Sequence, residues 1–167
     1  MAQSGSLKQS IVDESLEDSL LATFFAKRAL TYDLLDSLSD DDMALQSAQL
    51  CGMLGQQFHR LGQAQDHRIQ ALRTGQLSAD NSALILPFEK DQSVAALIAY
   101  LKALDDLLEE ELLNIKFNKV SWFGDEAAVA EYLQSLSEHE ILHHGQWIVQ
   151  FAQFERPLPQ SWDVLNV

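Results

Sequence analysis

Apolar residues recur every three or four positions in four segments of the chain, which is the spacing of an amphipathic helix. These segments cover about residues 16–38, 45–73, 93–112 and 125–154. A Ser-Asp-Asp-Asp run, residues 39–42, interrupts the pattern after the first segment and could cap the second helix. Four amphipathic helices in one chain predict an all-α fold, an up-down-up-down four-helix bundle.

The segments outside these helices follow other patterns. Residues 74–93 contain turn formers and a proline, and predict a long loop. Residues 113–123 alternate between apolar and polar, which predicts an extended connector that could include a short strand. We expect a loose N-terminal lead-in over residues 1–13 and an irregular C-terminal strap over residues 156–167, within a single domain that spans the whole chain 1–167.

Composition and charge narrow the classes of function. The chain has 167 residues, of which 47% are hydrophobic and 22% charged, as is usual for a globular protein. Its formal net charge is −14, and only 11 residues are Lys or Arg. Nucleic-acid binding needs a basic surface, so the charge argues against DNA or RNA as a partner.

We expect no targeting segment in this sequence. Cys51 is the only cysteine, which excludes an internal disulfide and fits a reducing compartment. We expect its side chain to be small and buried, not a nucleophile. The N-terminus lacks the features of a signal peptide, and no apolar run is long enough to span a membrane. These observations predict a cytoplasmic protein.

The stretch HEILHHGQW, residues 139–147, holds the candidate chemistry. His139 and His143 are four residues apart, so on a helix they project from one face, and that face is the apolar stripe. One interpretation is a pair of core histidines satisfied by hydrogen bonds. The other is a pair of metal ligands, because imidazole is the commonest metal ligand.

A third ligand would come from another helix, and His59 is the candidate. Gly52, Gly55 and Gly62 share its helical face, which suggests space cleared for a ligand or for close helix packing. In an up-down-up-down bundle the second and fourth helices run the same way. His59 would then lie about 21 Å along its helix, level with the other pair.

The two remaining histidines are weaker candidates. His67 is eight residues after His59, and we expect it to face solvent. His144 points about 100° away from His143 and is not expected to bind the same metal.

H-E-x-x-H is also the signature of zinc peptidases, in which Glu140 would be the general base. The longer form of that signature needs glycine and histidine where this chain has Gln146 and Val149. A downstream glutamate ligand could only be Glu155. The sequence therefore argues against a peptidase.

The run His139-Glu140-Ile141-Leu142-His143-His144-Gly145-Gln146 resembles the last-helix motif of the DinB/YfiT-like superfamily. In that family the histidines six and two residues before the glycine bind metal, which matches His139 and His143. His144 stands where the family commonly has arginine. The segment FHRLGQAQDHRIQALRTG, residues 58–75, is similar to the family's second helix and places His59 as the third ligand. Pro159-Gln160-Ser161-Trp162 resembles the ending of some members.

The resemblance implies a four-helix bundle with a three-histidine site for a divalent metal, most often nickel or zinc, and frequently a homodimer. Characterised relatives are metal-dependent thiol transferases or a thiol-dependent isomerase. We therefore expect a metal-dependent enzyme, a thiol S-transferase or hydrolase, that acts on a small molecule and uses a low-molecular-weight thiol. The second hypothesis is a non-catalytic metal-binding or dimeric interaction module of a stress response.

Five residues near the expected metal could contribute further. Glu140 could orient a ligand or act as a base, although a solvent-facing glutamate is the simpler interpretation. The pocket candidates are Gly55, Gly62, Gln146 and Trp147, with core packing as the alternative for the tryptophan.

Overall fold

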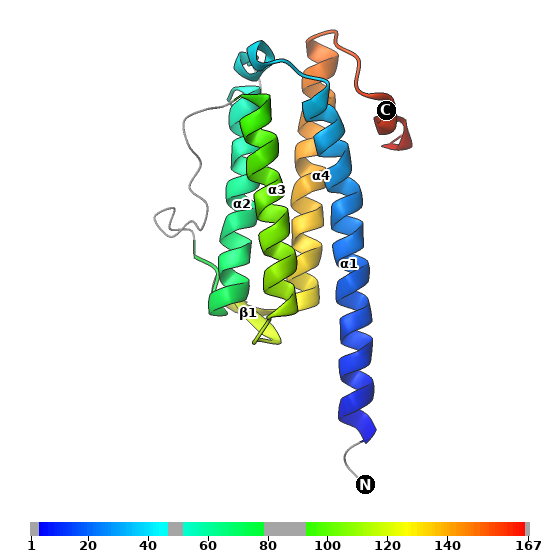
Figure 1. The fold of residues 1–167 in the computed structure, drawn as a ribbon, viewed down its shortest axis with the longest axis vertical. Helices are drawn as coiled ribbons and strands as arrows, with labels where there is room; N and C mark the ends of the chain where they lie inside the picture. The colour runs from blue at the N-terminus through cyan, green and yellow to red at the C-terminus, as the bar shows by residue number, and fades with distance from the viewer. Residues whose placement is uncertain (1–3, 47–51, 79–92, 166–167) are drawn as a thin grey trace.

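The computed structural model describes residues 4–46, 52–78 and 93–165. Four long helices form a bundle (Figure 1), which confirms the all-α prediction: α1 (Ser4–Asp36), α2 (Leu54–Thr74), α3 (Val94–Leu113) and α4 (Val129–Gln153). Shorter elements complete the fold: the 3₁₀ helices η1 (Asp40–Ala44) and η3 (Gln160–Leu165), and the strands β1 (Lys119–Trp122) and β2 (Asp125–Ala128).

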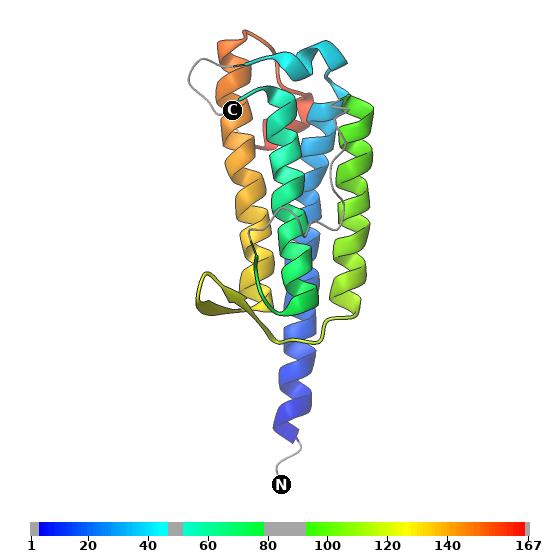
Figure 2. The ribbon, with the colours of Figure 1, turned by 90° about the vertical axis from the view of Figure 1, so that its left-hand side faces the viewer.

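The helices run up-down-down-up, so the predicted up-down-up-down order is wrong (Figures 1 and 2). The backbone N–H of Val94 donates to Asp40 Oδ1 at 2.8 Å, which holds the start of α3 beside the end of α1. α3 therefore runs parallel to α2. The connection between Thr74 and Val94 has enough residues to span the bundle from the end of α2 back to the level where α2 starts. An extended residue spans about 3.3 Å, whereas a helical residue rises only about 1.5 Å.

The helix boundaries also differ from the predicted ones. α1 begins at Ser4, inside the segment predicted as a loose lead-in, because extending an existing helix by one residue costs little compared with starting one. α2 begins at Leu54 instead of about residue 45. An isolated bridge between Gln46 and Met53 and a positive φ of 89° at Gly52 precede it, and neither is compatible with a continuous helix.

The Ser-Asp-Asp-Asp run caps η1 and not α2. The backbone N–H of Ser39 donates to the Asp42 carboxylate at 2.9 Å, and Asp42 is itself buried. Arg156, just beyond α4, forms an ion pair with the same carboxylate at 2.5 Å.

A β-hairpin lies at the end of the bundle that is at the bottom of Figures 1 and 2, and β1 confirms the short strand predicted within residues 113–123. β1 pairs antiparallel with β2, from Lys119 opposite Ala128 to Trp122 opposite Asp125. β2 occupies residues that the hydrophobic pattern assigned to the fourth helix, which therefore begins at Val129 and not at 125.

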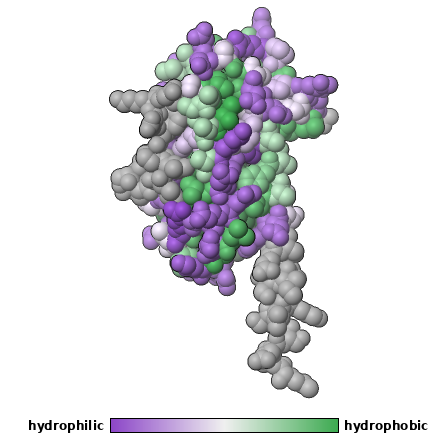
Figure 3. Space-filling model, viewed as in Figure 1, coloured by the Kyte–Doolittle hydropathy of each residue, from purple (hydrophilic) through white to green (hydrophobic). Residues whose placement is uncertain are grey.

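The core lies along the axis of the bundle and is built from all four helices. The C-terminal strap packs over α1, where buried Trp162 donates its indole N–H to the Leu30 carbonyl at 3.0 Å. On the face seen in Figure 3, polar residues are interspersed with apolar ones. No helix within the described ranges is long and apolar enough to cross a membrane. Cys51 and most of the predicted loop, residues 79–92, lie outside the described residues.

Candidate functional site

His139 and His143 lie together on α4. Their rings are 4.9 Å apart between centroids and nearly perpendicular, at 69°. His143 is buried, with 7% of its surface exposed, and His139 is half-buried. Within the described part of the chain, neither His139 Nε2 nor His143 Nδ1 has a hydrogen-bond partner, although both atoms are buried. The interpretation as hydrogen-bonded core histidines therefore fails for these two nitrogens.

Both imidazoles are held in the neutral form. Burial, together with the positive charge of Arg68, lowers the pKa of His139 to about 4. Burial and the neighbouring His139 lower the pKa of His143 to about 4 as well. A neutral imidazole keeps a lone pair on one nitrogen, which is the state that binds metal.

His59 lies on α2, directly after Phe58, and its ring centroid is 6.1 Å from that of Tyr100 on α3. The adjacent Phe58 ring stacks on Trp147, with centroids 4.3 Å apart, and Trp147 lies 5.6 Å from the His143 ring. Trp147 is one helical turn beyond His143 on α4, so the level that we predicted for His59 stays a prediction. The argument from parallel helices is wrong, because α2 and α4 run antiparallel (Figures 1 and 2). Burial lowers the pKa of His59 too.

The three histidines are not gathered into one group. Among the described residues, no three His, Cys, Asp or Glu side chains lie together in an arrangement that could hold a metal ion. The structure brings His139 and His143 together, and the assignment of His59 as the third ligand stays a prediction.

Two of the pocket candidates are packing positions. A Cβ at Gly62 would lie 2.2 Å from Cε1 of Tyr100, so this glycine allows the tyrosine ring of α3 to approach α2 closely. Trp147 is fully buried against Phe58. Gly55 is also buried, whereas Gln146 is half-buried and remains a candidate for contact with a ligand.

Glu140 faces the interior and not solvent, contrary to the simpler interpretation of its role. Its side chain is 1% exposed, and Glu140 Oε2 forms an ion pair with Arg28 at 3.3 Å. Glu140 Oε1 accepts a hydrogen bond from the Thr31 hydroxyl. Burial raises the pKa of Glu140, and Arg28 acts in the opposite direction. Because Arg28 and Thr31 already bind this carboxylate in the core, we interpret Glu140 as a structural residue and not as a base that acts on substrate.

The remaining histidines occupy different positions. The His144 Nε2 atom lies 2.9 Å from Thr31 Oγ1, and the His144 ring lies 4.8 Å from that of Trp162, so it points to α1 and the strap, away from the pair. Burial lowers its pKa to about 4. His67 is half-buried and not fully solvent-facing.

Sequence patterns did not identify the buried polar residues Arg28, which pairs with Glu140, and Gln65 and Asp105, which contact Arg28. Arg28, Gln65 and Asp105 all lie in the core. For two of them the helical spacing indicated a buried position. Arg28 follows the core residue Phe24 by one helical turn, and Asp105 follows the core residue Leu101 in the same way. Charged residues at core positions are unusual unless they are paired.

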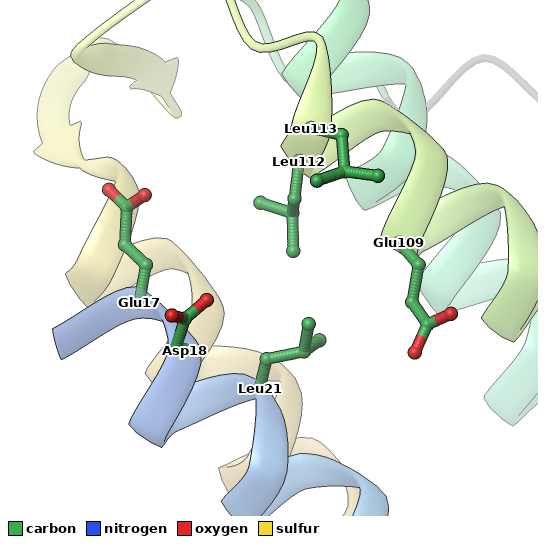
Figure 4. Close-up of a pocket in the computed structure, with 6 residues that line it drawn as sticks. All are labelled: Glu17, Asp18, Leu21, Glu109, Leu112 and Leu113. Atoms are coloured by element: carbon green, nitrogen blue, oxygen red, sulfur yellow. The ribbon is translucent and has the colours of Figure 1, made fainter. Parts of the chain in front are cut away.

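A pocket of about 460 Å³ opens between α1 and α3, away from the histidines. Figure 4 shows its lining: Glu17, Asp18 and Leu21 from α1, and Glu109, Leu112 and Leu113 from α3. Three of these side chains are carboxylates, and none is a histidine or a cysteine, so this pocket is not part of the predicted metal site.

A solved structure identifies the fold. The chain is similar to a DinB-like protein, YjoA, from Bacillus subtilis, whose crystal structure is known at 2.30 Å resolution. The match has a TM-score of 0.65 and covers 86% of this chain and 96% of that one. The protein has a DinB-like fold. The two sequences are 18% identical, a level at which the likeness shows the fold alone.

The other comparisons add nothing to this assignment. No protein-family model matches the sequence, and no curated protein matches it. The DinB-like fold agrees with the resemblance seen in the last helix, and the chemistry has to be argued from the residues of this chain.

Proposed function

We propose that this DinB-like protein binds a divalent metal ion, nickel or zinc, through His139 and His143 of α4, with His59 of α2 as the third ligand. The observation that carries the proposal is the buried pair of neutral imidazoles, because His139 Nε2 and His143 Nδ1 have no hydrogen-bond partners among the described residues. Buried polar atoms without partners cost about 1–3 kcal/mol each, so their retention calls for a ligand.

The donor set fits zinc and nickel better than magnesium or calcium. Imidazole suits the first two metals, whereas the hard cations prefer oxygen ligands. His59 would complete three ligands by rotating its side chain toward the pair. A site with three protein ligands leaves a position open, as in catalytic metal centres.

We further propose an enzymatic role, a thiol S-transferase or a hydrolase that acts on a small molecule. A metal bound here would lower the pKa of a coordinated thiol or water. The chain itself would contribute the wall of Phe58 and Trp147, which excludes water from one side, and the half-buried Gln146 amide, which could bind substrate. We do not assign Glu140 as the base, because Arg28 and Thr31 hold it in the core.

Metal content of the purified protein tests the site. We expect about one zinc or nickel ion per chain, lost in His143→Ala and in His59→Ala, and retained in His67→Ala as a matched control on α2. Folding of each variant is checked by circular dichroism. Wild-type protein that stays metal-free after dialysis against either ion contradicts the proposal.

The enzymatic role needs a separate test. Wild-type and His143→Ala proteins are screened for thiol conjugation and for hydrolysis with each metal. Turnover that depends on the histidine supports an enzyme. The absence of turnover in a metal-loaded protein favours the second candidate, a non-catalytic metal-binding or homodimeric module, which the burial of Glu140 also favours.

A further inference from the structure

Arg28 lies in the centre of the bundle and reaches the other three long helices. Its side chain is 1% exposed. Arg28 Nη2 donates to Gln65 Oε1 of α2 at 2.6 Å and lies 3.3 Å from Glu140 Oε2 of α4. Arg28 Nε lies 3.5 Å from Asp105 Oδ1 of α3. One guanidinium from α1 therefore connects all four helices.

The groups around this guanidinium also bind one another. Gln65 Nε2 donates to Asp105 Oδ1 at 2.8 Å, and the Tyr32 hydroxyl donates to Asp105 Oδ2 at 2.5 Å. On the other side, Thr31 donates to Glu140. We call Arg28, Gln65, Asp105 and Glu140 the arginine junction.

The junction contacts both helices that carry the predicted metal ligands. Gln65 is six residues after His59 on α2, and Glu140 directly follows His139 on α4. Arg28 therefore contacts the two helices, α2 and α4, that carry these histidines. Their separation and rotation determine where the His59 ring can stand relative to the His139–His143 pair.

Stability alone does not account for a charged group in this position. Replacing a buried ion pair with apolar residues is often neutral or stabilising, because both charges lose their hydration when they are buried. A guanidinium constrains geometry, because its planar set of N–H donors fixes the positions of several acceptors at once.

We propose that Arg28 is a positioning residue of the metal site, which sets the spacing of α2 and α4 through Gln65 and Glu140. This inference rests on the proposed metal-binding function. Groups that orient metal ligands from outside typically contribute about 10-fold to 100-fold in metal affinity.

The test compares Zn²⁺ affinity in Arg28→Met, Arg28→Lys and wild-type protein, by competition with a chromophoric chelator. We expect affinity to fall at least about tenfold in Arg28→Met. Arg28→Lys should lose affinity as well, because one ammonium group cannot hold acceptors on three helices. Absorption of the Co²⁺-loaded proteins should show altered ligand-field bands in both variants.

Gln65→Met provides a second variant in case Arg28→Met does not fold. It removes the hydrogen bonds that Gln65 makes to Arg28 and to Asp105, keeps the ion pair between Arg28 and Glu140, and should also weaken Zn²⁺ binding. Arg73→Met is the matched control. Arg73 pairs with Glu111 at 2.5 Å between α2 and α3, at the end of the bundle, so its loss should leave affinity and spectrum unchanged.

The outcomes separate this inference from the proposed function. Folded Arg28→Met and Gln65→Met proteins that unfold at lower temperature but bind Zn²⁺ and Co²⁺ like wild type would overturn the positioning role, with the metal site intact. Wild-type protein that binds neither ion would overturn both proposals.

Discussion

Gly62 shows how a single missing methyl group decides the contact between two helices. The Tyr100 ring occupies the space next to its Cα, and a Cβ there would lie 2.2 Å from Cε1 and 2.9 Å from Cδ1 of that ring. The sequence revealed that glycines surround His59, but it could not distinguish a pocket from close packing. That distinction depends on the ring of another helix, 38 positions away in the chain.

We expect Gly62→Ala to destabilise the protein by about 1–3 kcal/mol, because displacing a packed ring outweighs the gain in helix propensity. Gly145→Ala is the matched control. It is also inside a helix, but apart from the adjacent residues and the backbone of its own helix, no atom of the described residues lies within 4 Å of its added Cβ, so it should stabilise by up to about 1 kcal/mol. Urea unfolding measures both. Equal stabilisation by the two substitutions would contradict close packing at Gly62.

The buried histidines predict a dependence of stability on pH in the metal-free protein. Burial lowers the pKa of His144 to about 4, from about 6.5 in the unfolded chain. Between these values the unfolded chain binds a proton that the folded chain does not, so stability falls as the pH falls from 6.5 to 4. His139 and His143 act in the same direction, whereas Glu140 opposes them because its pKa is raised.

His144→Gln isolates one of these contributions. In the presence of a chelator, unfolding free energies at pH 7, 6 and 5 should decline less steeply in the variant than in wild type. The difference should approach about 1.4 kcal/mol per pH unit below pH 6. Parallel pH profiles for the two proteins would show that His144 is protonated equally in both states.

Among the elements, those with a sustained hydrophobic period were the predictable ones. All four long helices and the strand β1 were found from the sequence. Their starts were less accurate: α2 and α4 begin later than predicted because a bridge at Gln46 and the strand β2 precede them. β2 has the sequence Asp-Glu-Ala-Ala, which does not alternate between apolar and polar residues, so the hydrophobic pattern gave no indication of a strand there.

The hairpin between β1 and β2 contains an unfavourable turn. Phe123 and Gly124 form a two-residue loop with φ of 49° and 95°, the type that favours Asn-Gly. Phe123 is 83% exposed, so its ring gains little from packing. Phe123→Asn should stabilise the protein by about 0.5–1 kcal/mol, since asparagine tolerates positive φ. A lower melting temperature in the variant would show that the ring packs against a partner.

At the scale of the whole molecule, helix direction was the feature that the sequence could not supply. Four amphipathic helices led to the up-down-up-down prediction, because the hydrophobic pattern gives the faces of the helices but not their directions. The long connection before Val94 lets α3 start beside Asp40, and this makes α2 and α3 parallel. His139 and His143 were recognisable from their spacing on one helix, whereas the arginine junction was not, because its members come from four helices.

A metal bound between α2 and α4 would link two antiparallel helices, so its binding should stabilise the entire bundle. Free Zn²⁺ or Ni²⁺ at 100 times the dissociation constant should raise the unfolding free energy by about 2.7 kcal/mol, provided that the unfolded chain does not bind the ion. Thermal unfolding of chelator-stripped protein, titrated with each ion, measures the effect. Mg²⁺ at the same concentration should leave the melting temperature unchanged, because imidazole is a poor ligand for it. A shift of the same size with Mg²⁺ would mean that the 25 carboxylate side chains bind cations nonspecifically, and that the histidine pair is not the site of stabilisation.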